Sequence, residues 1–287
     1  TLPNDTHGTM CGTSMSAPHV SGAVALFVEY YRGLSGGLPP SPALVKAAFL
    51  PVAHDLAGHK DADGYTLGHP FDSKQGWGRL NVAAVVSPTL PVRYWDAPLI
   101  LDETGETWTQ TLRPDDPDQP VRLMLVWTDA PGHGLGGSIP AWNNDLDLIV
   151  EAEGNTYHGN YFGAGGWSQT GGSADAQNNT EGVLLGPIPP ANFVVRVVAS
   201  NINSDGVPHY GDDTDQDFAL ACYNCSQGAD FQLSATPDSL AVCVPDVVTS
   251  TLQVNEFLTY PYSVTLTTTN LPSGVMATLN PMVVTPT

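Results

Sequence analysis

Apolar residues near the start of the chain recur at helical spacing. Val20, Ala23, Val24, Phe27 and Val28 follow one another at short helical intervals, and most positions between them are apolar or small as well. This pattern predicts a helix that is buried on nearly every side rather than an amphipathic surface helix.

A second, shorter helix is expected over ALVKAAFL. Ser41-Pro42 supplies an N-cap followed by proline in the first helical position, and Pro51 ends the segment. Together the two helices indicate that residues 1–86 form the helical end of an α/β domain.

From about residue 96 the pattern changes to that of β-strands. Short runs rich in Val, Leu and Ile are separated by Gly, Pro, Asn and Asp, which is typical of strands joined by turns. The expected strands cover residues 121–129, 145–153, 181–188, 192–201 and 217–223. Strands at this spacing predict a jelly-roll barrel or β-sandwich domain over residues 96–227. Residues 87–95, SPTLPVRYW, are expected to be the linker that precedes it.

The last segment, residues 228–287, carries the alternating run YSVTLTTTN. Alternation predicts strands of a further β module, but the segment is too short to bury a self-sufficient core. The predicted fold class is therefore multidomain, with an incomplete α/β domain, an all-β domain and a truncated β module.

The charge balance is strongly acidic. The chain of 287 residues has 29 Asp and Glu against 9 Lys and Arg, a formal net charge of −20. Nucleic acid is excluded as a partner because no basic stripe could neutralise phosphates. The chain has no run of about 18 apolar residues, so no membrane-spanning helix is predicted. Such acidity favours cation binding or a salty exterior, with a solvated acidic surface as the simpler alternative.

Three of the four cysteines are clustered: Cys222, Cys225 and Cys243. No histidine stands beside them, so the group favours one disulfide plus a spare thiol over a zinc site. The spacing leaves the pairing open.

Ser14 lies on a Gly-Thr turn immediately before the first apolar helix. A serine at a helix N-terminus is usually an N-cap. The same position would also hold its hydroxyl on a rigid element and point a free N–H and the helix dipole at a developing oxyanion.

The full string GTSMSAPHVSG resembles the active-site serine motif of the subtilisin-like serine proteases, the subtilases, with Ser14 at the position of the nucleophile. GWGRLNVAAVV, residues 76–86, resembles the glycine-rich turn and final helix that close their catalytic domain. The resemblance covers residues 1–86. It implies that Ser14 attacks the peptide carbonyl and that its backbone N–H is one oxyanion-hole donor, in a serine-type endopeptidase acting on protein or peptide substrates.

The chain departs from the subtilase pattern in what precedes the serine. Subtilases place their catalytic residues in the order Asp, His, Ser, so the Asp, the His and the oxyanion Asn are expected upstream of Thr1. The fragment alone is then expected to be inactive. His7 and His19 are not marked as bases, and no acid stands at triad-like spacing from the loop histidines, His54, His59 and His69. Cys11 is expected to be a small buried residue.

A set of oxygen-bearing side chains in the β domain predicts a structural calcium site. On a strand, Asp145 and Asp147 share one face, and Asp129 ends the preceding predicted strand. Carboxylate and amide oxygens suit Ca²⁺, whereas the simpler alternative is that they cap turns. The expected ligands are Asp129, Asn144, Asp145, Asp147, Asp175 and Asn179.

Residues 143–160 and 175–202 resemble the C-terminal β-barrel of a subset of bacterial subtilases, relatives of which bind calcium, and this favours the calcium interpretation. The final segment resembles the immunoglobulin-like repeats of secreted bacterial proteases. These resemblances imply an extracellular protein, with attachment to a surface or polymer through its C-terminal β modules.

Two other function classes remain open. The first is a secreted calcium-binding adhesion or binding protein with a vestigial protease domain. The second is a thiol enzyme that uses Cys11 or the Cys222/Cys225 pair.

Overall fold

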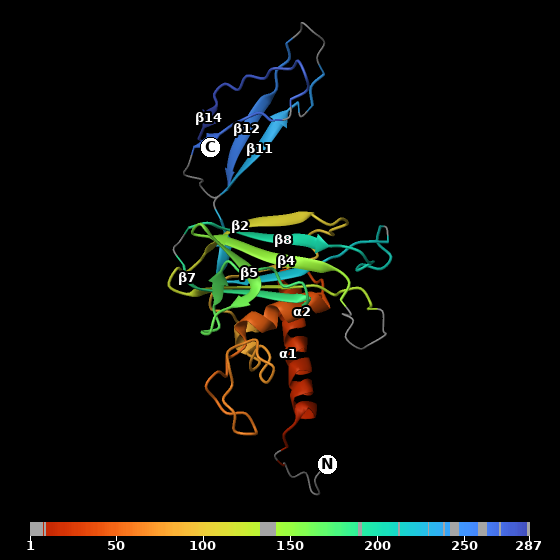
Figure 1. Cartoon of the computed structure of the whole chain (residues 1–287), viewed down its shortest axis with the longest axis vertical. Coiled ribbons are helices and arrows are strands. Elements are labelled where there is room, and N and C mark those ends of the chain that lie inside the picture. Colours follow the sequence, from red (N-terminus) through yellow and green to blue (C-terminus); the bar gives the residue numbers. More distant parts are fainter. Residues whose placement is uncertain are drawn as a thin grey trace.

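The computed structural model describes residues 8, 10–132, 142–188, 191–211, 213–228, 230–237, 239–241, 247–257, 263–269 and 271–285. Most of the regular structure is β-sheet, and a few helices gather on one side of the central sheets (Figure 1). The β-rich character predicted for the middle of the chain is confirmed.

The expected helices are present, and an additional 3-10 helix follows the second of them. They are α1 (Thr13–Leu34), α2 (Pro42–Phe49), the 3-10 helix η2 (Leu50–Val52) and α3 (Val82–Val86). The Ser41 side chain accepts a hydrogen bond from Leu44 N–H at 3.0 Å, which confirms the predicted N-cap of α2.

Two antiparallel sheets form the central domain. Their strands are β1 (Val92–Asp96), β2 (Thr107–Pro114), β3 (Pro120–Val126), β4 (Asp145–Ala152), β5 (Asn155–Phe162), β6 (Ser168–Thr170), β7 (Thr180–Pro187), β8 (Phe193–Asn201), β9 (Ala219–Tyr223) and β10 (Cys225–Gln227). One sheet has the order β1-β9-β3-β7 and the other β10-β2-β8-β4-β5-β6. With the short strands β6 and β10 set aside, this is the strand order of a jelly roll.

An apolar core fills the space between the sheets. Alternate residues of facing strands, among them Leu123, Leu148 and Val197, are completely buried there. Because side chains from both sheets point into this core, the strands are rich in Val and Leu, and the sequence therefore shows these runs.

The linker prediction is wrong in its second half. Residues 92–96 form β1, which pairs with β9 from Val92 to Asp96, so the domain begins inside the segment expected to be a linker. Asp96 also accepts a hydrogen bond from Ser41 N–H at 2.8 Å, which ties this strand to the start of α2. The place of VRYWD in a sheet explains why this segment is rich in apolar and aromatic residues.

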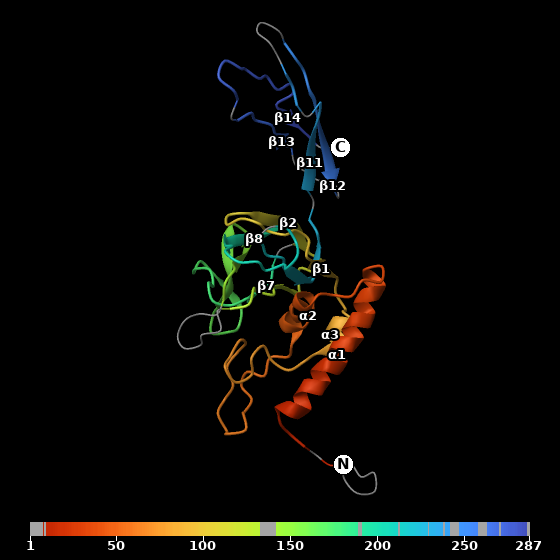
Figure 2. The ribbon, with the colours of Figure 1, turned by 90° about the vertical axis from the view of Figure 1, so that its right-hand side faces the viewer.

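The helices pack on the outer face of the sheet β1-β9-β3-β7 (Figure 2). A second core joins Leu44, Ala47 and Ala48 of α2 to Met124 and Ala221 of the sheet. The Tyr223 hydroxyl donates a hydrogen bond to Ala48 C=O at 2.8 Å inside this core. The N-terminal segment and the jelly roll therefore share this second core.

The expectation that α1 is buried on nearly every side is wrong for the described residues. Only Ala23 and Phe27 are buried, whereas Val20, Leu26 and Leu34 are each about half exposed. One stripe of α1 contacts the second core, and the described residues supply no cover for the rest of its apolar surface.

Cys222 and Cys225 form a disulfide at the corner where the chain passes from β9 in one sheet to β10 in the other. Asn224 between them has φ 61° and donates hydrogen bonds to Asp116 C=O and Gln119 C=O. Asparagine tolerates this left-handed conformation better than most residues. Cys243 lies outside the described residues.

The last segment contains two small antiparallel pairs, β11 (Asp230–Thr236) with β12 (Thr251–Phe257) and β13 (Val264–Thr265) with β14 (Val283–Val284). An immunoglobulin-like module stays a prediction. No helix in the described part of the chain is both long and apolar enough to cross a membrane.

Replacement of Tyr223 by Phe tests the shared core. The change removes the hydroxyl that satisfies Ala48 C=O in a buried position, so the free energy of unfolding should fall by about 1–2 kcal/mol. Urea unfolding followed by tryptophan fluorescence and by helical circular dichroism should show the same shift in both signals. Tyr210→Phe, at an exposed ring, is the matched control. A shift in only one signal would show that the helices and the sheets unfold separately.

Candidate functional site

Ser14 is the second residue of α1 and not its N-cap. Gly12 is the N-cap, with φ 144°, and no side chain caps the helix. A residue with a side chain rarely adopts this φ, so glycine is needed at the turn that presents Ser14. The simpler alternative, in which Ser14 itself caps the helix, is therefore wrong.

The polar groups of Ser14 are available to a ligand. The side chain is exposed, and within the described residues neither its hydroxyl nor its backbone N–H has a hydrogen-bond partner. The first N–H groups of a helix lack internal acceptors and carry the positive end of the helix dipole. The site can therefore place a hydroxyl and an N–H donor beside the same carbonyl group.

His19 does not act on Ser14 in this structure. It lies five residues further along α1, which places it about 140° around the helix axis. Its Nδ1 lies 2.6 Å from Met15 C=O of the same helix. This contact lies within its own helix, so His19 is not positioned as a base for Ser14. His7 lies outside the described residues.

A histidine–carboxylate pair exists that the sequence did not reveal. His69 Nδ1 lies 2.5 Å from Asp55 Oδ2, although no acid was expected to partner the loop histidines. Burial opposes ionisation of Asp55, but hydrogen bonds from Ala57 N–H, His69 and Gln75 outweigh it and hold the pKa of Asp55 below its ordinary value. The two residues are 14 positions apart, and only the folding of the loop brings them together.

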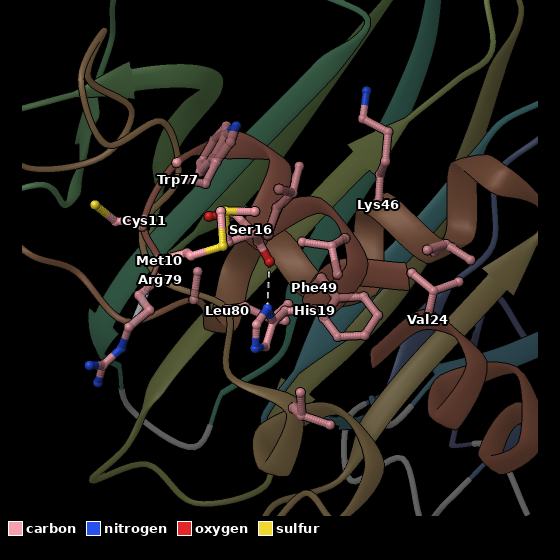
Figure 3. A pocket seen from close by; sticks show the side chains of 18 residues that line it. Met10, Cys11, Ser16, His19, Val24, Lys46, Phe49, Trp77, Arg79 and Leu80 are labelled. Atoms are coloured by element: carbon pink, nitrogen blue, oxygen red, sulfur yellow. Dashed lines mark hydrogen bonds between the residues drawn. The ribbon is translucent and has the colours of Figure 1, made fainter. Parts of the chain in front are cut away.

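Ser14 lines neither the cavity that contains the Asp55–His69 pair nor the larger cavity beside α1. A mainly apolar cavity of about 910 Å³ lies along α1 and is lined by Met15, Ser16, His19, Phe49 and Trp77 among others (Figure 3). Asp55 and His69 line a different, smaller cavity. The pair is therefore not placed as the base and acid for Ser14.

Cys11 is exposed, so the expectation of a small buried residue is wrong. Its side chain lines the same cavity beside α1 (Figure 3). Cys222 and Cys225 are both fully buried and bonded to each other, which argues against their use as reactive thiols.

Four acidic side chains lie close enough at one end of the jelly roll to influence one another. Burial, followed by the charges of Asp147, Asp175 and Asp129, raises the pKa of Asp145 to about 6. Asp147 Oδ1 is buried and has no hydrogen-bond partner among the described residues. Strand β4 carries both Asp145 and Asp147 of this acidic site, and their role as metal ligands stays a prediction.

Glu181 belongs to this acidic site and was missed. It is completely buried at the start of β7, and its Oε2 accepts a hydrogen bond from Leu148 N–H at 2.7 Å. Its Oε1 has no partner in the described part of the chain. Burial, and then the charges of Asp147, Asp175 and Asp145, raise its pKa to about 9. The sequence signal was a glutamate that directly precedes a run of apolar strand residues.

The side chains of Asp129 and Asn144, two of the expected calcium ligands, already form hydrogen bonds with other residues. The Asp129 carboxylate accepts hydrogen bonds from the N–H groups of Asn143 and Asn144. Asn144 Oδ1 accepts two backbone N–H bonds, and its Nδ2 donates to Ser204 C=O, Asp215 C=O and Gln216 Oε1. Both residues therefore hold loops together at this end of the domain.

Asp175 lies in the loop before β7, where its Oδ2 accepts hydrogen bonds from Asn160 and Asn178. Asn179 C=O accepts a hydrogen bond from Trp127 N–H at 3.2 Å. Among the described residues, no three His, Cys, Asp or Glu side chains converge in a geometry that could hold a metal ion.

Comparison with known proteins relates the Ser14 segment to serine proteases. Residues 1–78 match the family described as "Subtilase family". A stretch of 64 residues is 42% identical to "Major intracellular serine protease" of Bacillus subtilis (strain 168), covering 21% of this chain and 20% of that protein. The chain thus spans about a fifth of the length of this curated relative. The matches support a serine protease relationship for the N-terminal segment.

The pH dependence of stability tests the burial of Glu181. Its ordinary pKa is 4.5 and its pKa in the folded protein is about 9, so the folded state binds this proton more tightly. The stabilisation it contributes is complete below pH 4.5 and is lost as pH rises toward 9, by up to about 1.4 kcal/mol per pH unit.

Urea unfolding at pH 5, 7 and 9 in a chelator should show this loss in the native protein. Glu181→Gln keeps the shape without the titration, so its stability should depend less on pH. Glu103→Gln, on an exposed loop, should behave as the native protein does. Equal slopes in the native protein and Glu181→Gln would contradict the buried neutral carboxyl.

Proposed function

We propose that this chain carries the nucleophile-bearing part of a serine endopeptidase of the subtilisin type. The observation that supports the proposal most directly is the exposed Ser14 with a free N–H in the first turn of α1, within the segment that matches the subtilase family. Ser14 Oγ attacks the carbonyl carbon of a peptide bond and gives its proton to a base; the C–N bond then breaks, the amine leaves with that proton, and the acyl group stays on Oγ.

The chain's own contribution to the transition state is electrostatic. As the carbonyl oxygen becomes negative, the N–H of Ser14 donates a hydrogen bond to it, and the dipole of α1 favours the charge. Gly12 allows the turn that leaves this N–H unobstructed. The donor is already in place before reaction, so no reorganisation is required of it.

The base, the acid that orients it and the oxyanion Asn are proposed to come from polypeptide that precedes Thr1. Two observations support an outside source: His19 bonds within its own helix, and His69 lines a cavity to which Ser14 does not contribute. The exposed apolar side chains of α1 and the cavity of about 910 Å³ beside them provide a surface for such a segment. Protein or peptide substrates follow from this proposal.

The tested protein should be the form that includes the complete catalytic domain. Ser14→Ala should lower peptide hydrolysis by about a millionfold, the scale seen when a serine protease loses its nucleophile. Ser16→Ala makes the same chemical change two residues away, at a hydroxyl that lines the apolar cavity, and should keep most activity. Circular dichroism checks that both variants fold. Unchanged hydrolysis in Ser14→Ala would remove Ser14 as the nucleophile, whereas no hydrolysis by the native protein would favour the adhesion alternative.

A structural calcium ion is a second proposal, supported by the acidic site. Buried oxygens without partners, Glu181 Oε1 and Asp147 Oδ1, lie near Asp145 and Asp175. Hard carboxylate oxygens suit Ca²⁺, and a cation would offset the cost of burying their charge. Asp129, Asn144 and Asp175 fit less well because their side chains already form hydrogen bonds with backbone N–H groups. Asp145, Asp147 and Glu181 are the proposed ligands, and they would have to move together to bind one ion, because no three of the described side chains converge as they stand.

An extracellular location is part of the same proposal. The Cys222–Cys225 disulfide supports it, because disulfides persist mainly in oxidising compartments. The matched relative carries the word "intracellular" in its name, and that name applies to the relative alone. Attachment to a surface or polymer through residues 228–287 stays a prediction.

Calcium should raise the melting temperature by several degrees over the value in EDTA, because a ligand that binds only the folded state at about 100 times its dissociation constant adds about 2.7 kcal/mol. Asp147→Asn should reduce this shift. Asp118→Asn, an exposed aspartate, is the matched control. Equal melting temperatures in calcium and in EDTA at low salt would exclude the ion.

A further inference from the structure

A second cavity, of about 220 Å³, lies where the N-terminal segment meets the jelly roll. Its buried base contains Pro51 and Leu184, and its exposed rim contains His69 and Trp167. The walls therefore come from both parts of the chain.

Arg122 is the cation of this cavity. It projects from β3, is only partly accessible, and lies with its guanidinium carbon 5.4 Å from the centre of the Trp167 ring. Its Nη1 donates one hydrogen bond, to Pro51 C=O at 3.0 Å. No carboxylate forms a salt bridge with it among the described residues. Since a guanidinium has five N–H donors, most of them remain for a ligand or for water.

Asp55 is the carboxylate whose charge acts on Arg122, but it forms no salt bridge with Arg122. Both Asp55 oxygens accept hydrogen bonds, Oδ1 from Ala57 N–H and Gln75 and Oδ2 from the His69 ring. Burial lowers the pKa of Arg122, and the more distant charge of Asp55 opposes this effect. In a chain of net charge −20, a partly buried arginine without a carboxylate partner is unusual.

We propose that this cavity is a binding site for a single carboxylate group, held by the Arg122 guanidinium beside the ring of Trp167. The planar fork of arginine matches the two oxygens of a carboxylate, and such charge-assisted bonds are among the strongest hydrogen bonds in proteins. The apolar base, with Pro51 and Leu184, suits the carbon chain that bears the carboxylate.

The surroundings select a monoanion over a dianion. The negative charge of Asp55 on the cavity wall repels a second negative charge, so phosphate and sulfate are disfavoured relative to carboxylate. A volume of about 220 Å³ also falls below that of an ordinary small-molecule pocket. The ligand is either a small free carboxylic acid or the terminal carboxylate of a peptide.

Titration of the purified protein with sodium acetate at constant ionic strength tests the site. The indole N–H resonances of Trp77 and Trp167, which both line the cavity, should shift and saturate, whereas neutral acetamide should give no saturable shift. N-acetylglycine and its amide distinguish the sources. Tighter binding of N-acetylglycine than of acetate identifies a peptide terminus, and equal or weaker binding identifies a small free acid.

Arg122→Gln should weaken acetate binding by at least about tenfold. Arg93→Gln, which removes the same charge from an exposed position of β1, should bind acetate as the native protein does. Trp167→Leu, at an exposed side chain, should weaken it by about two- to fivefold while leaving the fold intact. Circular dichroism checks the fold of all three. If Arg122→Gln does not fold, Trp167→Leu decides the outcome.

The proposal is overturned if acetate gives no saturable shift up to about 100 mM, if acetamide or phosphate binds as tightly as acetate, or if neither Arg122→Gln nor Trp167→Leu weakens binding. None of these outcomes depends on peptidase activity, so they leave the assignment of Ser14 untouched.

Discussion

The packing of α2 against the outer face of the sheet β1-β9-β3-β7 is the contact on which the arrangement of the molecule depends. Ala43, Ala47 and Ala48 are small enough for the helix to approach the sheet closely, and the Tyr223 hydroxyl satisfies a helix carbonyl in the same buried layer. Because α1 packs on this layer through Phe27, the position of Ser14 is set partly by the jelly roll. The β domain thus belongs to the support of the candidate site.

Electrostatics imposes the second constraint. Nearly all of the described acidic side chains are exposed or partly exposed, where water screens their repulsion, but the jelly roll brings Asp145, Asp147 and Glu181 together with little access to water. Such a group must bind protons or a cation to keep its folded geometry, since buried unpaired charge is costly. The cavity at Arg122 shows the opposite imbalance, with a partly buried positive charge that lacks a direct partner. Both imbalances arise where residues from distant strands or loops meet.

Part of the candidate site was predictable from local pattern. Ser14 and its helix follow from the turn and the apolar run after it, and Asp145 and Asp147 follow from the two-residue period of a strand. Glu181 and the Asp55–His69 pair were missed because their partners are distant in the sequence. Asn144 was expected to be a ligand because of its chemistry, but the fold uses all of its side-chain hydrogen bonds to join three loops.

The sequence by itself determined the helix starts, the strands with runs of Val and Leu, and the β-rich class of residues 96–227, because these depend on capping and on burial of consecutive residues. It did not reveal β2 or β5, whose residues are largely polar and partly exposed, or β1, which is hidden in an apparent linker. Only the tertiary structure decided that the helices and the jelly roll share a core, that one side of α1 is left exposed, and which charges are buried. Those outcomes depend on contacts between segments far apart in the chain, which no local pattern records.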